Sequence, residues 1–192
     1  SDKLVSLLSS EKIAETSYLT VSVDGGDDKS YNAAHSLTPK VKVYNRVIDN
    51  IKKITSISKG NKIKLDLSAN YLVTKVNCAK DEIFSGVENL INAGVDSIRF
   101  SFPQLPRGID SYEGTIIPNR DEVKRIYTDI KPIIDQFKDS KTKVVLIDYD
   151  ADKEINEPRT LPCFSRFIYP AISYDGYLSN CSQSAASHFQ DM

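Results

Sequence analysis

Cys163 and Cys181 are two of the chain's three cysteines, and they flank a segment with the composition of a β-hairpin. Between them lie two β-rich runs around Asp175-Gly176, a dipeptide typical of tight turns. Such a hairpin would carry both thiols at its base. Three interpretations are open: a disulfide, two buried small side chains, or half of a metal site.

The overall composition bears on that choice. No apolar run approaches the roughly 18 residues that span a bilayer, and the start of the chain lacks the apolar core of a signal peptide. We therefore expect a cytoplasmic location, where a structural disulfide is disfavoured. The formal net charge of -1 provides no overall field that would favour nucleic acid or an anionic membrane, so we expect neither as a partner.

Ser22 and Asp24 end a β-rich run, and Gly25-Gly26 follows, where glycine permits a backbone turn. In parallel α/β folds ligands bind at the carboxyl ends of strands. Residues two apart share a face of a strand, so this hydroxyl and this carboxylate could bind the diol of a ribose or another sugar. Alternatively, Asp24 shapes the turn and Ser22 bonds nearby backbone.

Arg99 lies inside a predicted strand, where it needs a carboxylate or an anionic ligand if it points inward, although an outward, solvated arginine fits equally. Asn70, Thr74 and Asn77 could add polar groups to the same carboxyl-end face, or serve as turn and ladder residues. Cys78 is most simply a small, partly buried residue.

Several familiar motifs are missing from the sequence. Neither His35 nor His188 has zinc-ligand spacing to a cysteine, aspartate or histidine, so we interpret both as surface or locally bonded. G-x-S-x-G, G-x-G-x-x-G and G-x-x-x-x-G-K-[ST] do not occur, which removes motif support for a nucleophile elbow, a Rossmann site and a P-loop.

Apolar periodicity predicts alternating helices and strands. We expect helices over 2–15, 41–59, 80–94 and 121–137, and strands over 17–23, 62–77, 96–102 and 143–148. Pro132 should kink or divide the last helix. Residues 103–119 are predicted to form a long loop, and a polar linker should lead from about residue 151 into the hairpin at 163–181. Such alternation argues for βαβ crossovers: an α/β fold with a parallel sheet, open or curved into part of a barrel.

Four stretches together resemble the C-terminal half of a radical S-adenosylmethionine (SAM) enzyme of the SPASM/twitch group. "YLTVSVDGG" with "SYNAAH" is similar to the fourth barrel strand of that family, and "YNRVIDNIKKI" to the helix after it. "YLVTKVN" with "DEIFSGVENLINAGVDSIRFSFP" is similar to the fifth and sixth strands and the intervening helix. "CFSRFIYPAISYDGYLSNC" matches the C-x(9–15)-G-x(4)-C signature through Cys163, Gly176 and Cys181.

The resemblance implies a parallel-stranded partial TIM-type barrel over 1–150, followed over 151–192 by a linker and the first β-hairpin of a SPASM/twitch-like domain. It implies that Ser22 and Asp24 approach the SAM ribose, with Asn70 and Arg99 as further cofactor-binding residues. Cys163 and Cys181 would ligate an auxiliary 4Fe-4S cluster. The expected activity is hydrogen abstraction from a peptide or small-molecule substrate, with a flavodoxin or ferredoxin as electron donor; no catalytic residue is assigned.

The sequence departs from the family pattern in one large respect. The C-x3-C-x2-C loop that holds the catalytic cluster is absent, and three cysteines so far apart cannot rebuild it. We therefore expect a piece of a larger protein, inactive by itself. Two alternatives stay open: an α/β binding or scaffold module without a cluster, and an ordinary barrel enzyme such as an aldolase, for which Lys75 and Asp148 are weak candidates.

Overall fold

The computed structural model describes residues 17–60, 65–103, 113–147, 171–172 and 178–179. The chain divides into two compact units, Ser1–Tyr149 and Asp150–Met192. The predicted helix over 2–15 and the predicted linker lie outside the described residues, as do both cysteines of the predicted hairpin.

The first unit contains a parallel sheet whose strands follow one another in chain order. These strands are β1 (Ser17–Ser22), β2 (Leu65–Leu72), β3 (Ser97–Ser101) and β4 (Lys143–Leu146). The sheet order is β1-β2-β3-β4, and every neighbouring pair is parallel. The predicted α/β class and parallel strands are confirmed.

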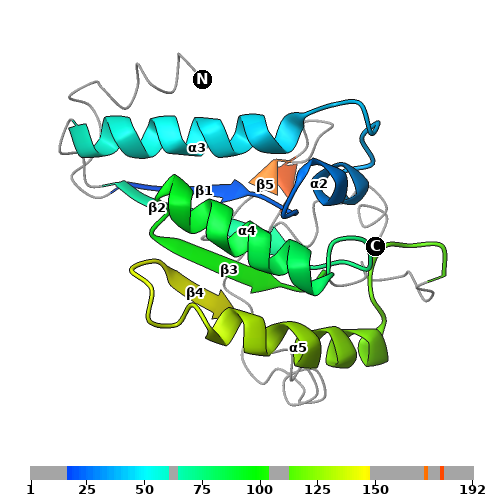
Figure 1. Cartoon of the computed structure of the whole chain (residues 1–192). Coiled ribbons are helices and arrows are strands. Elements are labelled where there is room, and N and C mark those ends of the chain that lie inside the picture. The colour runs from blue at the N-terminus through cyan, green and yellow to red at the C-terminus, as the bar shows by residue number, and fades with distance from the viewer. Residues whose placement is uncertain (1–16, 61–64, 104–112, 148–170, 173–177, 180–192) are drawn as a thin grey trace. The chain divides into compact units, whose positions relative to one another are not determined.

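Helices connect the strands and lie on one face of this sheet (Figure 1). α2 (Asp28–Ala34) and α3 (Val43–Gly60) lead from β1 to β2, α4 (Lys80–Ala93) from β2 to β3, and α5 (Arg120–Asp135) from β3 to β4. Crossovers of one hand that always step to the next strand place their helices on the same face. A doubly wound sheet instead reverses its strand order. The described βα units are therefore consistent with a partial barrel.

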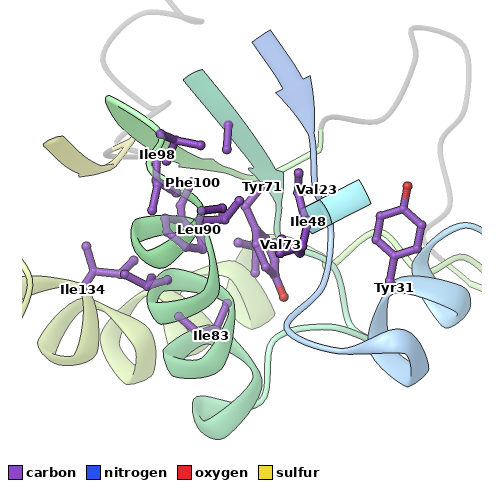
Figure 2. Close-up of a cluster of buried hydrophobic side chains, with 14 of the residues drawn as sticks. Val23, Tyr31, Ile48, Tyr71, Val73, Ile83, Leu90, Ile98, Phe100 and Ile134 are labelled. Carbon is purple, nitrogen blue, oxygen red and sulfur yellow. The ribbon is translucent and has the colours of Figure 1, made fainter. Parts of the chain in front are cut away.

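The core fills the space between the sheet and these helices (Figure 2). Side chains of β2 alternate in burial: Leu67, Ala69 and Tyr71 are buried, and the residues between them are not. Tyr71 and Phe100 are fully buried with ring centroids 4.9 Å apart. Apolar positions three or four apart on α4 and α5 cover them, as the helical periodicity predicted.

Several features differ from the sequence prediction, and three of them have a clear physical reason. β2 ends at Leu72 rather than Asn77, because a side-chain turn replaces the ladder after it. α5 continues through Pro132 without being divided; Pro132 is exposed, so water can serve the carbonyl that loses its amide partner. α2 was not predicted, because it has little apolar periodicity; a reciprocal capping box between Asp27 and Ser30 starts it.

The second unit contains a pair of short antiparallel strands, β5 (Ala171–Ile172) and β6 (Leu178–Ser179). Antiparallel pairing at this separation is typical of a hairpin. Cys163 and Cys181 are not among the described residues, so the choice among disulfide, buried pair and metal site stays a prediction. Within the described part of the chain, no helix combines the length and apolar character needed to cross a bilayer.

Candidate cofactor-binding face

Polar side chains predominate on the sheet face opposite the described helices, which also carries Tyr18, Leu72 and Val145. Alternation along the strands places six of them there: Thr20 and Ser22 on β1, Ser68 and Asn70 on β2, and Ser97 and Arg99 on β3. We call these six residues the polar face. Branched apolar residues dominate the interior of a complete TIM barrel, so a sheet with this lining is suited to a polar ligand rather than to a dry core.

Three of the four predicted cofactor residues stand in one row across this face. The Cα of Ser22 pairs with that of Asn70, and the Cα of Asn70 pairs with that of Arg99. Cross-strand partners in register lie on the same side of a sheet, with Cβ atoms about 5 Å apart. A hydroxyl, an amide and a guanidinium thus form a continuous line of hydrogen-bonding groups, and it begins at the carboxyl end of β1.

Arg99 is exposed, and no described carboxylate pairs with it. The structure therefore favours the solvated arginine over one neutralised by a protein partner. Ser22 is also exposed and Asn70 is half-buried. The row therefore retains hydrogen-bond donors that are free to bind the oxygen atoms of an anionic or hydroxyl-bearing ligand.

A second row lies nearer the amino ends of the strands. The Ser97 hydroxyl donates to the Ser68 oxygen at 2.9 Å, and the Ser68 hydroxyl donates to Asp66 at 3.2 Å. Sequence reasoning missed this row. The signal was present, because Asp66, Ser68 and Asn70 on β2 and Ser97 and Arg99 on β3 alternate with buried apolar residues.

Asp24 differs from the rest of the predicted set because its carboxylate is buried against protein. Oδ1 accepts the backbone amide of Leu72 at 2.7 Å, and Oδ2 lies 3.2 Å from Nε2 of His35. Burial raises the pKa of Asp24, and the hydrogen bond from Leu72 and the nearby His35 only partly oppose this rise. His35 is thus locally bonded, as expected, whereas its partner could not be foreseen from local spacing.

Gly25 and Gly26 are required by close packing rather than by a left-handed backbone. Neither glycine has a positive φ. A Cβ on Gly25 would lie 2.5 Å from the Tyr31 amide nitrogen, and one on Gly26 would lie 2.1 Å from the Glu82 carbonyl oxygen. The sequence prediction gave turn formation as the reason for these glycines; the structure shows that they let the loop after β1 contact α2 and α4.

Thr74 and Asn77 take the turn role that was one of their two predicted alternatives. The fully buried Asn77 accepts from the Thr74 amide at 2.6 Å and from its hydroxyl at 2.8 Å. Its own amide donates to the carbonyls of Asp24 and Leu72 at 3.0 and 2.9 Å. Asn77 therefore ties the loops after β1 and β2 together beneath the candidate site.

The remaining candidate residues are paired with other protein groups, partly buried, or outside the described part of the chain. Lys75 pairs with Glu122 at 3.3 Å, and Asp148 lies outside the described residues. Cys78 is a partly buried free thiol, as predicted, and burial raises its pKa. Among the described residues no group of three or more His, Cys, Asp or Glu side chains could hold a metal ion.

Comparison with known proteins gives a relation of structure and none of sequence. No protein-family model and no curated protein sequence matches the chain. The crystal structure of Streptococcus suis SuiB matches with a TM-score of 0.57 at 15% sequence identity, covering 97% of this chain and 42% of that one. The chain thus spans less than half the length of SuiB, a radical SAM enzyme of the SPASM type. At this identity the likeness is a distant relation of fold.

Proposed function

We propose that the chain is part of a radical SAM enzyme and that the polar face binds SAM. The observation that carries the proposal is the row of Ser22, Asn70 and Arg99, which the register places side by side on the sheet face that the described helices leave uncovered. The fold relation to SuiB supports the same family.

The chemistry of the row fits SAM. The Ser22 hydroxyl and the Asn70 amide can each accept from and donate to a ribose diol, and the Arg99 guanidinium matches a carboxylate. Asp24 would hold the loop after β1 in place rather than bind SAM itself, because the Leu72 amide and His35 already engage its two oxygens. In this enzyme class SAM, cleaved reductively at a 4Fe-4S cluster, supplies the hydrogen-abstracting chemistry.

The described residues do not supply a cluster site of their own. Cys78 is the one cysteine among them, and it lies against the Lys75 carbonyl at 3.7 Å. We extend the proposal to an auxiliary 4Fe-4S cluster ligated by Cys163 and Cys181. The substrate would be a peptide or a small molecule, and a flavodoxin or ferredoxin would donate electrons.

Equilibrium dialysis of the chain against SAM tests the cofactor proposal. Arg99→Ala should weaken binding about tenfold or more, because a hydrogen bond to a charged group is worth about 1.5–3 kcal/mol. Arg46→Ala removes an exposed arginine from α3 and is the matched control. Equal affinity of Arg99→Ala and the unaltered chain, or no SAM binding by either, would contradict the proposal.

Anaerobic reconstitution with iron and sulfide tests the cluster separately. Because two thiolates alone do not complete a 4Fe-4S site, this test uses the full-length gene product. There the unaltered protein and Cys78→Ser should retain the iron and sulfide of this cluster, whereas Cys163→Ser and Cys181→Ser should lose both. Equal retention by all four proteins, or no retention by any, would remove the auxiliary cluster from the proposal. An iron-free chain that still binds SAM at Arg99 would leave the polar face as a binding module.

A further inference from the structure

Asp24 and His35 form a pair that the proposed SAM contacts leave unused. Asp24 lies two residues beyond the end of β1, and His35 caps the carboxyl end of α2. Their Oδ2 and Nε2 atoms are 3.2 Å apart. The pair thus sits at the carboxyl edge of the sheet, the edge at which ligands bind in parallel α/β folds.

The Leu72 amide alone does not explain a carboxylate at position 24. That amide requires only a neutral acceptor, which Asn or Ser would provide without the cost of burying a charge. The Asp24 side chain is 13% exposed, and no lysine or arginine in the described part of the chain pairs with it. Among the described residues, His35 is the partner of the second oxygen, so the charge at this position serves the imidazole.

His35 is held in one orientation. Its ring lies 4.3 Å, centroid to centroid, from the Tyr31 ring, and its backbone amide donates to the Tyr31 carbonyl at 3.1 Å. With Nε2 facing Asp24, Nδ1 is the nitrogen without a hydrogen-bond partner among the described residues, while the side chain is 35% exposed. An oriented imidazole with one engaged and one open nitrogen is the arrangement found in general bases.

The other ionisable groups around the pair do not compete for the proton. Burial is the main cause that raises the pKa of both Tyr31 and Tyr71. The Asp24 charge comes next for Tyr31, whereas for Tyr71 it comes after Glu82 and Tyr44. Both phenols therefore stay neutral where imidazole titrates.

We propose that His35 is a proton acceptor for a ligand hydroxyl or ammonium group, and that Asp24 is its positioning residue. In the transfer the bond between the ligand heteroatom and its hydrogen breaks, and its electron pair stays on the heteroatom. A new N–H bond forms at Nδ1, and the resulting imidazolium is stabilised by the Asp24 carboxylate. The inference requires neither SAM nor a cluster, so it stands apart from the proposed function.

Ethoxycarbonylation by diethyl pyrocarbonate measures the reactivity of the open nitrogen directly. The chain has two histidines, so a His188→Gln background leaves His35 as the reporter. At about pH 8, Asp24→Asn should slow the reaction severalfold, because a carboxylate stabilises the positive charge that develops on the ring as Nδ1 attacks, and a neutral amide stabilises it less. Asp28→Asn is the control, since Asp28 binds the Tyr44 amide and the Asn45 side chain instead.

A purely structural role for the pair predicts the opposite change in rate. If the pair only holds the loop in place, loss of the Asp24 charge frees the His35 ring, and Asp24→Asn reacts faster than the His188→Gln background. A faster rate would overturn the proposal, and so would an unchanged rate. Nitrogen-15 NMR of the unaltered imidazole provides a test that does not depend on folding of the variant. It should show a proton on Nε2 and none on Nδ1, and the reverse tautomer would refute the assignment.

Discussion

Asn70 and Arg99 are direct cross-strand partners on two parallel strands, and the alternating burial along both strands places them on the sheet face that the described helices leave uncovered. Ser22 extends their row to the edge strand of the sheet. Parallel sheets are usually covered on both faces by apolar layers. This polar row is the observation behind the proposed SAM site, and Asn77 joins the loops that follow β1 and β2.

Asn77→Ala should destabilise the first unit by about 3 kcal/mol, because it orphans a buried amide and two carbonyls and each unsatisfied group costs about 1–3 kcal/mol. The groups concerned are the Thr74 amide and the carbonyls of Asp24 and Leu72. Urea unfolding measures the difference. Asn92→Ala, on the exposed side of α4, should change the unfolding free energy by no more than about 0.5 kcal/mol. Similar values for the two variants would contradict the role of Asn77.

Gly26→Ala should cost about 1–3 kcal/mol or more, the range for overpacking, because its Cβ would meet the Glu82 carbonyl at 2.1 Å. Gly60→Ala is the matched substitution, since a Cβ there meets nothing within 4 Å. It should be neutral, or stabilise the chain by about 0.4–1 kcal/mol because alanine lowers the conformational entropy of the unfolded state. Thermal unfolding of both variants should separate them clearly, and a tolerated Gly26→Ala would show that the loop after β1 can move away from α4.

Asp24 and Asp27 should give stability profiles of opposite slope with pH. Burial raises the folded pKa of Asp24, so the folded state holds that proton more tightly and the contribution of Asp24 to stability falls as pH rises from 3.8 through the raised pKa. Burial would also raise the pKa of Asp27, but hydrogen bonds from Ser30 and the Lys29 amide outweigh it and lower that pKa. The contribution of Asp27 is therefore present above 3.8 and lost as pH falls through the lowered pKa.

Urea unfolding between acid and neutral pH measures these contributions as differences from the Asp24→Asn and Asp27→Asn variants. With rising pH the unaltered chain should lose stability relative to Asp24→Asn and gain it relative to Asp27→Asn. Parallel slopes for the two variants would mean that burial does not dominate at Asp24.

The sequence predicted the strands and long helices because their apolar residues repeat with the periods of two and 3.6 that a sheet and its covering helices require. The same reasoning missed α2, whose buried residues are Ser30, Tyr31 and Asn32 rather than an apolar stripe. A capping box and contacts with α3 hold this helix, and neither has a periodic signature.

The candidate site was predictable in its residue types but not in its pairing. Ser22, Asn70 and Arg99 could be assigned to strands, whereas their alignment in one row depends on the register of β1, β2 and β3. The contact between Asp24 and His35 depends on where α2 lies, so no local pattern predicted it. Placement of Asn77 in the turn rather than in the strand follows from its bonds to Thr74, Asp24 and Leu72.

The most direct test of the binding face is a titration of the nitrogen-15-labelled chain with SAM, followed by NMR. The account predicts that backbone shifts change first and most at Ser22, Asn70 and Arg99, and that Arg99→Ala needs about tenfold more SAM for the same response. Shift changes confined to the helix side, for example at Glu88 and Arg125, would contradict it, as would an unchanged spectrum with SAM in large excess.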